Sequence, residues 1–147
     1  MNRFTFLAIT FFTLCTLWMG VNCKKNDEEL GCDTNFLEAE INGSTWVAPK
    51  VTTLSFGYIR IFGRTDDSVP PSFNFDLPLD IPTGPYNLTQ NFSLIFYPEG
   101  GGVYSPRSGT LNVTTHDTTA RILRGTFEFV TEPANFVIKN GSFCVKY

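Results

Sequence analysis

Apolar residues recur at every second position along much of this chain, and this period constrains the fold more than any other feature of the sequence. Phe73, Phe75 and Leu77 alternate with polar neighbours, and Phe127 and Phe129 lie in a second run of the same kind. A period of two places alternate side chains on opposite faces of a strand, and no stretch has the 3.6-residue period of an amphipathic helix. The sequence therefore predicts half-buried β-strands.

The first clear local structure is a hairpin around Asn42-Gly43. The segment 37–41 alternates apolar and acidic residues, and the segment 44–48 returns after the Asn-Gly pair. Asn-Gly favours a two-residue type I′ turn because both residues tolerate positive φ. In that register Ala39 lies opposite Trp46, so a small side chain faces the indole on the buried side.

A second Asn-Gly pair, Asn140-Gly141, predicts a last hairpin over residues 136–147. The same turn type would pair Ile138 with Phe143 on the core face. Alternation along the returning strand then places Cys144 on the opposite, outer face.

Composition supports a single all-β domain after a short leader. Aromatic residues make up 15% of the chain, with 15 Phe, and rings fit strands better than helices. Residues 31–147 are close to the commonest domain size, and the sequence contains no internal repeat. We therefore predict one domain over 31–147 that forms an antiparallel β-sandwich or a closed β-barrel of about 8–10 short strands.

Residues 1–22 have the features of a lipoprotein signal peptide. Arg3 gives a minimal positive region and residues 4–19 are apolar or Thr, whereas six polar residues follow Cys23 at once. A lipoprotein carries its lipid on a thiol at the first mature position, and Cys15 lies inside the apolar run. We therefore predict a lipid on Cys23 and a tether over 23–30, although the Gly20-Val21-Asn22 site is atypical. The alternative is an uncleaved membrane anchor.

The charge balance bears on possible partners. All 14 acidic residues but only 10 of the 11 basic residues follow the leader, and the basic residues form no cluster. A nucleic-acid partner is therefore not expected. The membrane is the expected partner, through the lipid at Cys23.

Several short segments resemble a family of uncharacterised Bacteroidota lipoproteins that have a single all-β domain. They are Leu37–Trp46 (LEAEINGSTW), Gly125–Phe129 (GTFEF) and Asn140–Phe143 (NGSF), and the tether KKNDEE looks like that of lipoproteins carried to the outer face of the outer membrane. The resemblance implies a lipid-anchored protein of the cell outer membrane that faces the medium. The family has no assigned activity, so the resemblance implies none. A solvated linker is the alternative reading of the tether.

The four cysteines lead to one predicted disulfide. Cys15 leaves with the leader and Cys23 carries the lipid, so Cys32 and Cys144 remain in an exported, oxidising environment. A Cys32–Cys144 bond would fasten the arm before the first strand to the outer face of the last one. Two unpaired thiols are the alternative, because cysteine is readily buried as a small apolar residue.

The sequence contains no recognisable catalytic or metal-binding pattern. His116 is the only histidine, and we expect it to be a solvated side chain at a turn rather than a catalytic base. No Gly-x-Ser-x-Gly motif occurs, and one histidine with two spare cysteines is too few for a four-ligand zinc site. We therefore predict no enzyme activity, no metal and no cofactor.

Aromatic residues are the best sequence indication of a binding surface. Tyr58, Phe62, Tyr97 and Tyr104 lie on strands or loops where exposed rings can stack on a sugar or contact a partner protein. Filling the core or protecting a sheet edge is the alternative role.

The leading interpretation is a non-catalytic binding or structural accessory domain in the cell envelope. The alternatives are a glycan-binding module that assists a neighbouring uptake system, indicated by exposed aromatics on one sheet, and a small extracellular enzyme, indicated by a pocket with two carboxylates.

We predict that Cys23→Ala releases the protein from membranes or stalls its processing, because the residue that receives the lipid is lost. Membrane fractionation with mass analysis of the mature amino terminus measures both effects. A Cys23→Ala protein that is processed normally and stays membrane-bound would contradict the prediction.

Overall fold

The computed structural model describes residues 32–65, 70–90 and 93–147, which form ten strands in two antiparallel sheets. The predicted signal peptide 1–22 and tether 23–30 lie outside the described residues. Sheet A has the order β2-β1-β10-β9-β8-β6, and sheet B has the order β3-β4-β5-β7. The strands are β1 (Phe36–Ile41), β2 (Ser44–Val47), β3 (Lys50–Ser55), β4 (Tyr58–Arg64), β5 (Ser72–Pro78), β6 (Gly84–Asn87), β7 (Ser93–Tyr97), β8 (Ser105–Asp117), β9 (Ile122–Glu132) and β10 (Val137–Lys146).

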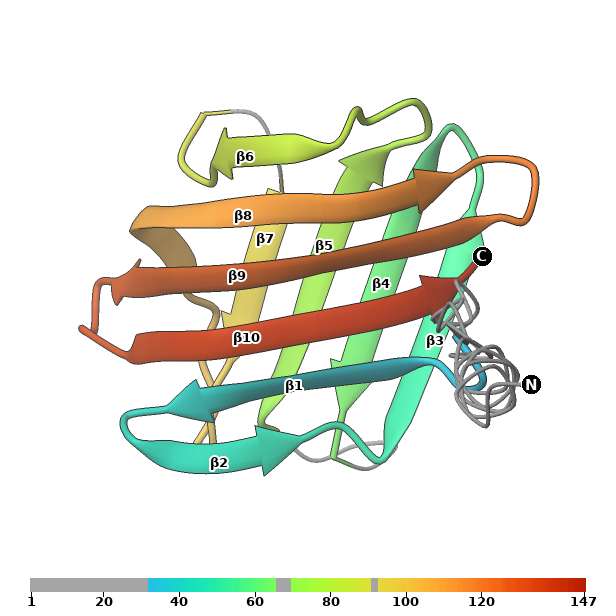
Figure 1. The fold of residues 1–147 in the computed structure, drawn as a ribbon. Helices are drawn as coiled ribbons and strands as arrows, with labels where there is room; N and C mark the ends of the chain where they lie inside the picture. Colours follow the sequence, from blue (N-terminus) through green and yellow to red (C-terminus); the bar gives the residue numbers. More distant parts are fainter. Residues whose placement is uncertain (1–31, 66–69, 91–92) are drawn as a thin grey trace, which may run out of the picture. The chain divides into compact units, whose positions relative to one another are not determined.

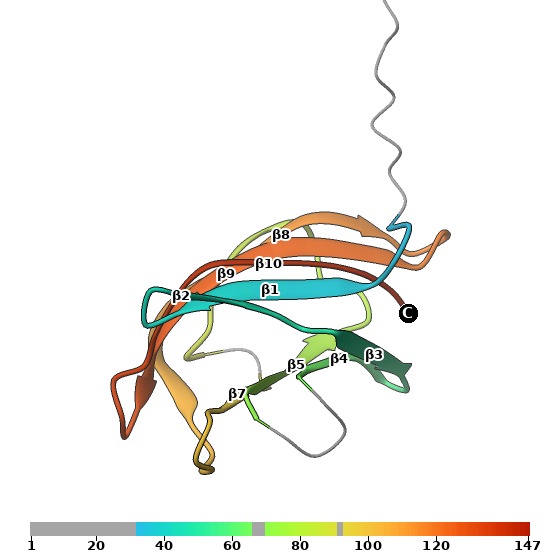
Figure 2. The same ribbon diagram turned by 90° about the horizontal axis from the view of Figure 1, so that it is seen from below.

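The two sheets stack as separate layers with their strands running in different directions (Figures 1 and 2). The architecture is therefore an antiparallel β-sandwich, which confirms the all-β prediction and decides against a closed barrel. The strand number agrees with the prediction, but β8, β9 and β10 contain 13, 11 and 10 residues and are longer than expected. Nothing among the described residues forms a helix long and apolar enough to cross a membrane.

The core lies between the sheets and is built from aromatic rings. Phe73 on β5 is fully buried, with its ring centroid 4.8 Å from that of Phe96 and 4.9 Å from that of Trp46. The rings of Phe127 and Phe129 approach Phe73 from sheet A. These buried residues all belong to the segment 32–147, so this unit contains its own core.

The first predicted hairpin is confirmed. Asn42 and Gly43 have φ of 52° and 83°, as a type I′ turn requires. Ala39 pairs with Trp46, and both side chains are buried. The pairing of a small residue with a large ring follows directly from the turn register.

The last predicted hairpin is wrong, because residues 137–146 form the single strand β10 between β1 and β9. Asn140 does adopt a positive φ of 49°, but it forms a bulge where the register shifts between Ile138 and Gly141. The bulge changes which alternate positions face inward, so Ile138, Phe143 and Val145 all reach the core from one strand. The Cβ of an alanine at Gly141 would lie 2.5 Å from the Phe127 ring, so a side chain there would displace that ring.

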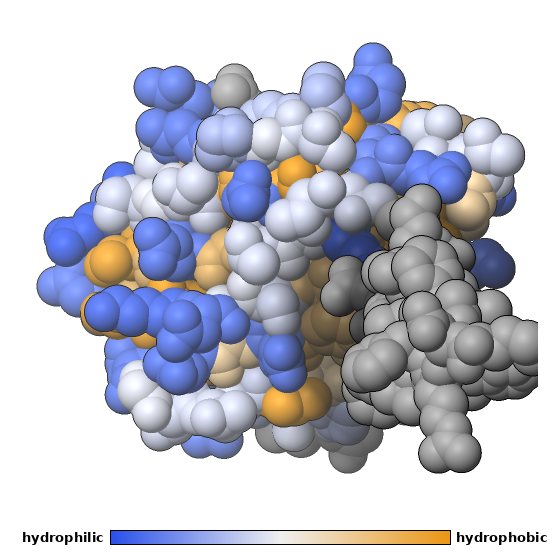
Figure 3. All heavy atoms as spheres, viewed as in Figure 1, coloured by the Kyte–Doolittle hydropathy of each residue, from blue (hydrophilic) through white to orange (hydrophobic). Residues whose placement is uncertain are grey.

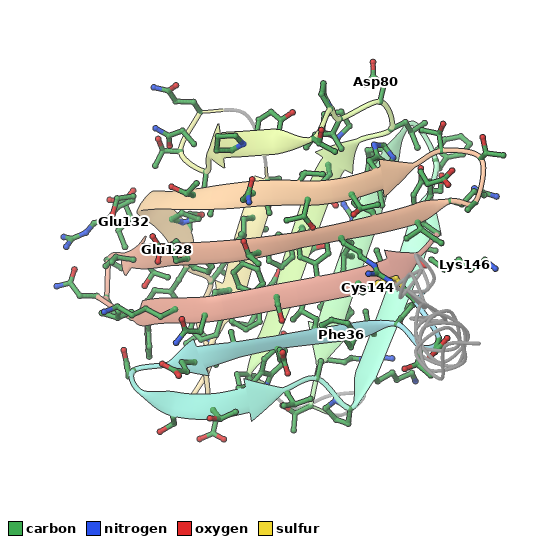
Figure 4. All side chains as sticks on the ribbon, viewed as in Figure 1. Phe36, Asp80, Glu128, Glu132, Cys144 and Lys146 are labelled. Atoms are coloured by element: carbon green, nitrogen blue, oxygen red, sulfur yellow. A yellow bond between two sulfur atoms is a disulfide. The ribbon has the colours of Figure 1, made fainter. Side chains whose placement is uncertain are left out.

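The predicted disulfide is confirmed. Cys32 and Cys144 are bonded across 112 residues, with their Cα atoms 5.8 Å apart. Cys144 alternates with core residues and so lies on the outer face of β10, next to Phe36 of β1 (Figure 4). Asn35 strengthens the attachment, because its side chain accepts a hydrogen bond from the Lys146 N–H at 2.7 Å and donates one to the Lys146 carbonyl at 3.3 Å. The arm before β1 is thus fixed to the end of β10.

We predict that the double variant Cys32→Ala, Cys144→Ala loses roughly 2–5 kcal/mol of unfolding free energy, because the disulfide closes a loop of more than about 100 residues in the unfolded chain. Urea unfolding of both proteins measures the loss. A reductant should destabilise the parent protein and leave the double variant unchanged. Alkylation of both cysteines in the folded, unreduced parent would contradict the assignment.

Candidate functional site

The outer face of sheet B carries three of the four predicted aromatic residues. Strand β4 alternates strictly, with Ile59 and Ile61 in the core and Tyr58, Arg60 and Phe62 pointing outward. Gly57, with φ of 75°, lies in the turn between β3 and β4 and starts this register. Strand β4 is therefore an interior strand of sheet B with an aromatic outer face.

Strand pairing brings the third ring to the same face. Arg64 pairs with Ser72, and Ser72 pairs with Tyr97 of β7, so these side chains form one row across the sheet. Along β4 the outward side chains alternate between rings and arginines, so aromatic and polar groups are mixed on this face. We call Tyr58, Arg60, Phe62, Asp76 and Tyr97 the sheet B face.

Charge on the sheet B face is balanced and held in fixed geometry. Arg60 Nε and Nη2 donate to the two Asp76 carboxylate oxygens at 2.6 and 2.7 Å, a bidentate pair between opposite residues of β4 and β5. These hydrogen bonds raise the pKa of the Arg60 guanidinium further above its high ordinary value, so Arg60 stays charged. The guanidinium carbon lies 5.1 Å from the Tyr58 ring centroid.

A second cation and an amide complete this surface. The Arg64 guanidinium carbon lies 5.5 Å from the Phe62 ring centroid. Arg60 lies over Tyr58 in the same way, four positions earlier along β4. Asn74 pairs with Phe62 on one side and Ile95 on the other. Within the described part of the chain, the buried Asn74 side-chain oxygen has no hydrogen-bond partner. The face therefore combines aromatic rings and planar polar groups, and the Asn74 oxygen beneath it is a buried acceptor without a partner among the described residues.

Tyr104 does not belong to the sheet B face. Its backbone forms an isolated bridge with Phe96, and its ring lies 5.3 Å from the Phe136 ring at the edge of the core. Tyr104 is half-buried there and packs against the core cluster. The alternative role of core filling therefore applies to Tyr104.

A cleft of about 370 Å³ opens between the two sheets at the end where β1 turns into β2. Its inner wall includes Trp46, Phe96 and Phe136, and its rim is polar. The Trp46 indole N–H donates to the Thr65 hydroxyl at 3.1 Å, which fixes the indole against the rim. Glu99 is the only carboxylate residue of this cleft among the described residues.

The outer face of sheet A is mainly polar (Figure 3). An open hollow of about 510 Å³ lies over the bulge of β10, where Gly141 has no side chain. Its lining is rich in hydroxyl and amide groups, including Thr126 and Ser142, and among the described residues Glu128 is its one carboxylate (Figure 4). Within that part of the chain, neither this hollow nor the cleft brings two carboxylates together.

The sequence suggested that His116 is a solvated side chain at a turn, and this prediction is wrong. Its Nδ1 lies 2.7 Å from the Ile81 carbonyl oxygen and its Nε2 lies 2.8 Å from the Tyr147 hydroxyl. A carbonyl only accepts, so Nδ1 carries the proton and Nε2 accepts from the tyrosine. His116 therefore links the loop after β5 to the carboxyl-terminal residue, and both ring nitrogens are engaged.

The described residues contain no cluster of three or more His, Cys, Asp or Glu that could hold a metal ion. Asp76 is engaged by Arg60, and Asp80 lies apart at the edge of the fold (Figure 4). The expectations that the chain binds no metal or cofactor and is not an enzyme stay predictions.

Sequence reasoning identified the rings of the sheet B face but missed its polar members. Arg60 was the one polar residue inside an apolar run, and Asp76 alternated outward on its own strand. Those two signals could have placed both side chains outside the core. Their pairing depends on the register between β4 and β5, which no local pattern specifies.

Comparison of this chain with protein families, with curated proteins and with solved structures found no match. The resemblance to Bacteroidota lipoproteins therefore stays a prediction.

We predict that the folded protein loses stability as the pH rises above about 10, the ordinary pKa of tyrosine, and that Tyr147 contributes to this loss. Burial raises the pKa of Tyr147, Asp117 raises it further and Arg121 lowers it. The folded state therefore favours the neutral phenol, which donates to His116, and this preference is lost as the pH rises through the folded-state pKa.

Urea unfolding between pH 8 and pH 12 of the parent and Tyr147→Phe tests this, since the variant should lose stability less steeply in the alkaline range. Thr126→Ala removes no titratable group and serves as the control that keeps the parental slope. Identical slopes for the parent and Tyr147→Phe would contradict the assignment.

Proposed function

We propose that this chain is a lipoprotein of the cell envelope, anchored through Cys23 in the outer membrane and facing the medium, and that residues 31–147 form a non-catalytic binding domain. The observation that carries the binding role is the sheet B face. Tyr58, Phe62 and Tyr97 share one outer face with a fixed Arg60–Asp76 pair. A face that serves only as protein surface has no need of this combination of rings and ordered polar groups.

The position of the Cys32–Cys144 disulfide supports an anchored domain. The bond and the Asn35 side chain fix the arm that leads from the tether to the end of β10. A pull on the tether is therefore carried by a covalent bond to a central strand of sheet A rather than by the first strand alone. This suits a domain that is held at a membrane.

A carbohydrate is the second part of the proposal, because the sheet B face has the chemistry that sugars require. A sugar ring presents an apolar C–H face, which stacks on aromatic rings, and hydroxyl groups at its rim. Carboxylate and guanidinium groups in a rigid pair offer both acceptors and donors to such hydroxyls. We propose that the domain captures glycan chains for a neighbouring uptake system.

A flat face suits an extended glycan better than a small isolated ligand. Neighbouring strands of the sheet are about 4.8 Å apart, and the three rings lie on two strands of one layer that are separated by β5. Tyr58 and Phe62 are on β4, and Tyr97 is two strands away on β7. A ligand that contacts all three rings must therefore run across the strands.

We predict that Phe62→Ala and Tyr97→Ala each weaken glycan binding about tenfold, because each removes a stacking ring worth roughly 1–2 kcal/mol. A glycan array followed by calorimetry on the chain from Cys23 onward identifies the ligand and measures the dissociation constant. Thr126→Ala, on the outer face of sheet A, is the matched control and should bind like the parent. Equal glycan affinity in all four proteins would reject the sheet B face as the binding site.

A further inference from the structure

Four apolar side chains lie exposed at one corner of sheet B. Phe56, in the turn between β3 and β4, is 90% exposed, and Leu54 is 60% exposed on the strand that leads to it. Tyr58 and Leu79 are each 38% exposed, and Tyr58 pairs with Pro78, the residue before Leu79. We call Leu54, Phe56 and Leu79 the hairpin-tip patch; Tyr58, at its edge, belongs to the sheet B face. A contiguous apolar patch of this kind marks an interaction surface.

The patch lies at the end of the domain where the tether begins. The Thr53 hydroxyl on β3 donates to the Lys146 carbonyl at 3.0 Å, which brings the tip of the β3–β4 hairpin close to the end of β10. Cys144, two residues before Lys146, is bonded to Cys32. Phe56 is three residues from Thr53 along the chain, and Cys144 is two residues from Lys146. Both the hairpin tip and the disulfide therefore lie within about 10 Å of the Thr53–Lys146 hydrogen bond.

The length of the tether limits how far the domain can stand from a bilayer. Eight residues lie between Cys23 and Cys32, and the nine steps from one cysteine to the other span at most about 30 Å when fully extended. A flexible chain has a much shorter average span. A lipid on Cys23 therefore keeps this end of the domain within reach of the membrane surface.

We propose that the hairpin-tip patch inserts into the lipid bilayer that holds the anchor, so that the membrane is a second binding partner of the folded domain. This inference rests on the lipid attachment of the proposed function. Phe56 at a hairpin tip presents a ring with little backbone around it, which suits shallow insertion at the boundary of headgroups and acyl chains.

Charge near the patch is mixed. Arg60 is paired with Asp76, Asp80 next to Leu79 is acidic, and Lys146 lies at the Thr53 contact (Figure 4). Vesicles with neutral headgroups remove electrostatic attraction to lipid, so they test apolar insertion alone.

The fold offers a matched control in Val103. It is 60% exposed, like Leu54, but lies two residues before Ser105, which pairs with Glu132. Glu132 and Lys146 lie at opposite ends of sheet A (Figure 4). Ten residues of β10 span about 30 Å, so Val103 is remote from the tether.

The experiment uses the chain that begins at Cys23, coupled through this thiol to a maleimide lipid in neutral phosphatidylcholine vesicles. Cys32 and Cys144 are bonded to each other, so Cys23 is the single free thiol. Phe56→Trp and Val103→Trp are compared at low surface density, with spin-labelled lipids as quenchers of tryptophan fluorescence. Trp46 is buried and gives a constant background.

We expect lipid quenching of Phe56→Trp to exceed that of Val103→Trp several-fold, with emission shifted to shorter wavelength only on coupling. Water-like emission from Phe56→Trp, or equal quenching at both positions, would overturn the proposal. A shift that appears only at high surface density would indicate a second copy as the occupant and would also overturn it. Chemical coupling makes these outcomes independent of lipid attachment in the cell, so failure of the anchor prediction at Cys23 is seen separately.

Discussion

The sandwich depends on one buried ring, Phe73, which joins the two sheets. From β5 of sheet B it meets three rings of sheet A, those of Trp46, Phe127 and Phe129, at centroid distances of 4.9–6.1 Å. Phe75 repeats this contact two residues along the same strand, with its ring centroid 4.9 Å from that of Phe127. Tilted and edge-to-face rings therefore form the centre of the contact between the sheets. With the inward positions so filled, the outward positions of sheet B are left available for binding.

Local patterns predicted those parts of the fold that local physics determines. Alternation identified the inward residues of β5 and β9, and the positive φ required at Asn42 and Gly43 specified the first hairpin. The same Asn-Gly signal failed at Asn140. A positive φ serves equally in a turn and in a bulge, and the choice depends on whether the following residues find their partner in the same chain segment or in distant strands. Strand β10 pairs with β9, its neighbour in sequence, and with β1, about a hundred residues earlier.

The binding face shows the same division between local and distant information. The outward positions of Tyr58 and Phe62 follow from alternation along β4, and the sequence suggested both as candidates. The place of Tyr97 on the same face requires the strand order β4-β5-β7, because β6 belongs to sheet A. Tyr104 looked equivalent in the sequence but packs on the core edge, because the bridge to Phe96 turns it inward. Topology, rather than residue type, distinguishes the two tyrosines.

The domain has two unlike ends, and the disulfide determines which of them is held. Cys32 is fixed to Cys144 near the carboxyl-terminal end of β10, whereas the cleft that contains Trp46 and Phe136 lies by the start of the same strand. A lipid at Cys23 would therefore hold the first end and leave the second free. The sheet B face runs between these ends. With a membrane contact at the hairpin tip, the side chains of this face would therefore point parallel to the membrane surface rather than toward it. In the anchored arrangement that we propose, the rings of the sheet B face would be directed sideways, where long chains in the medium could reach them.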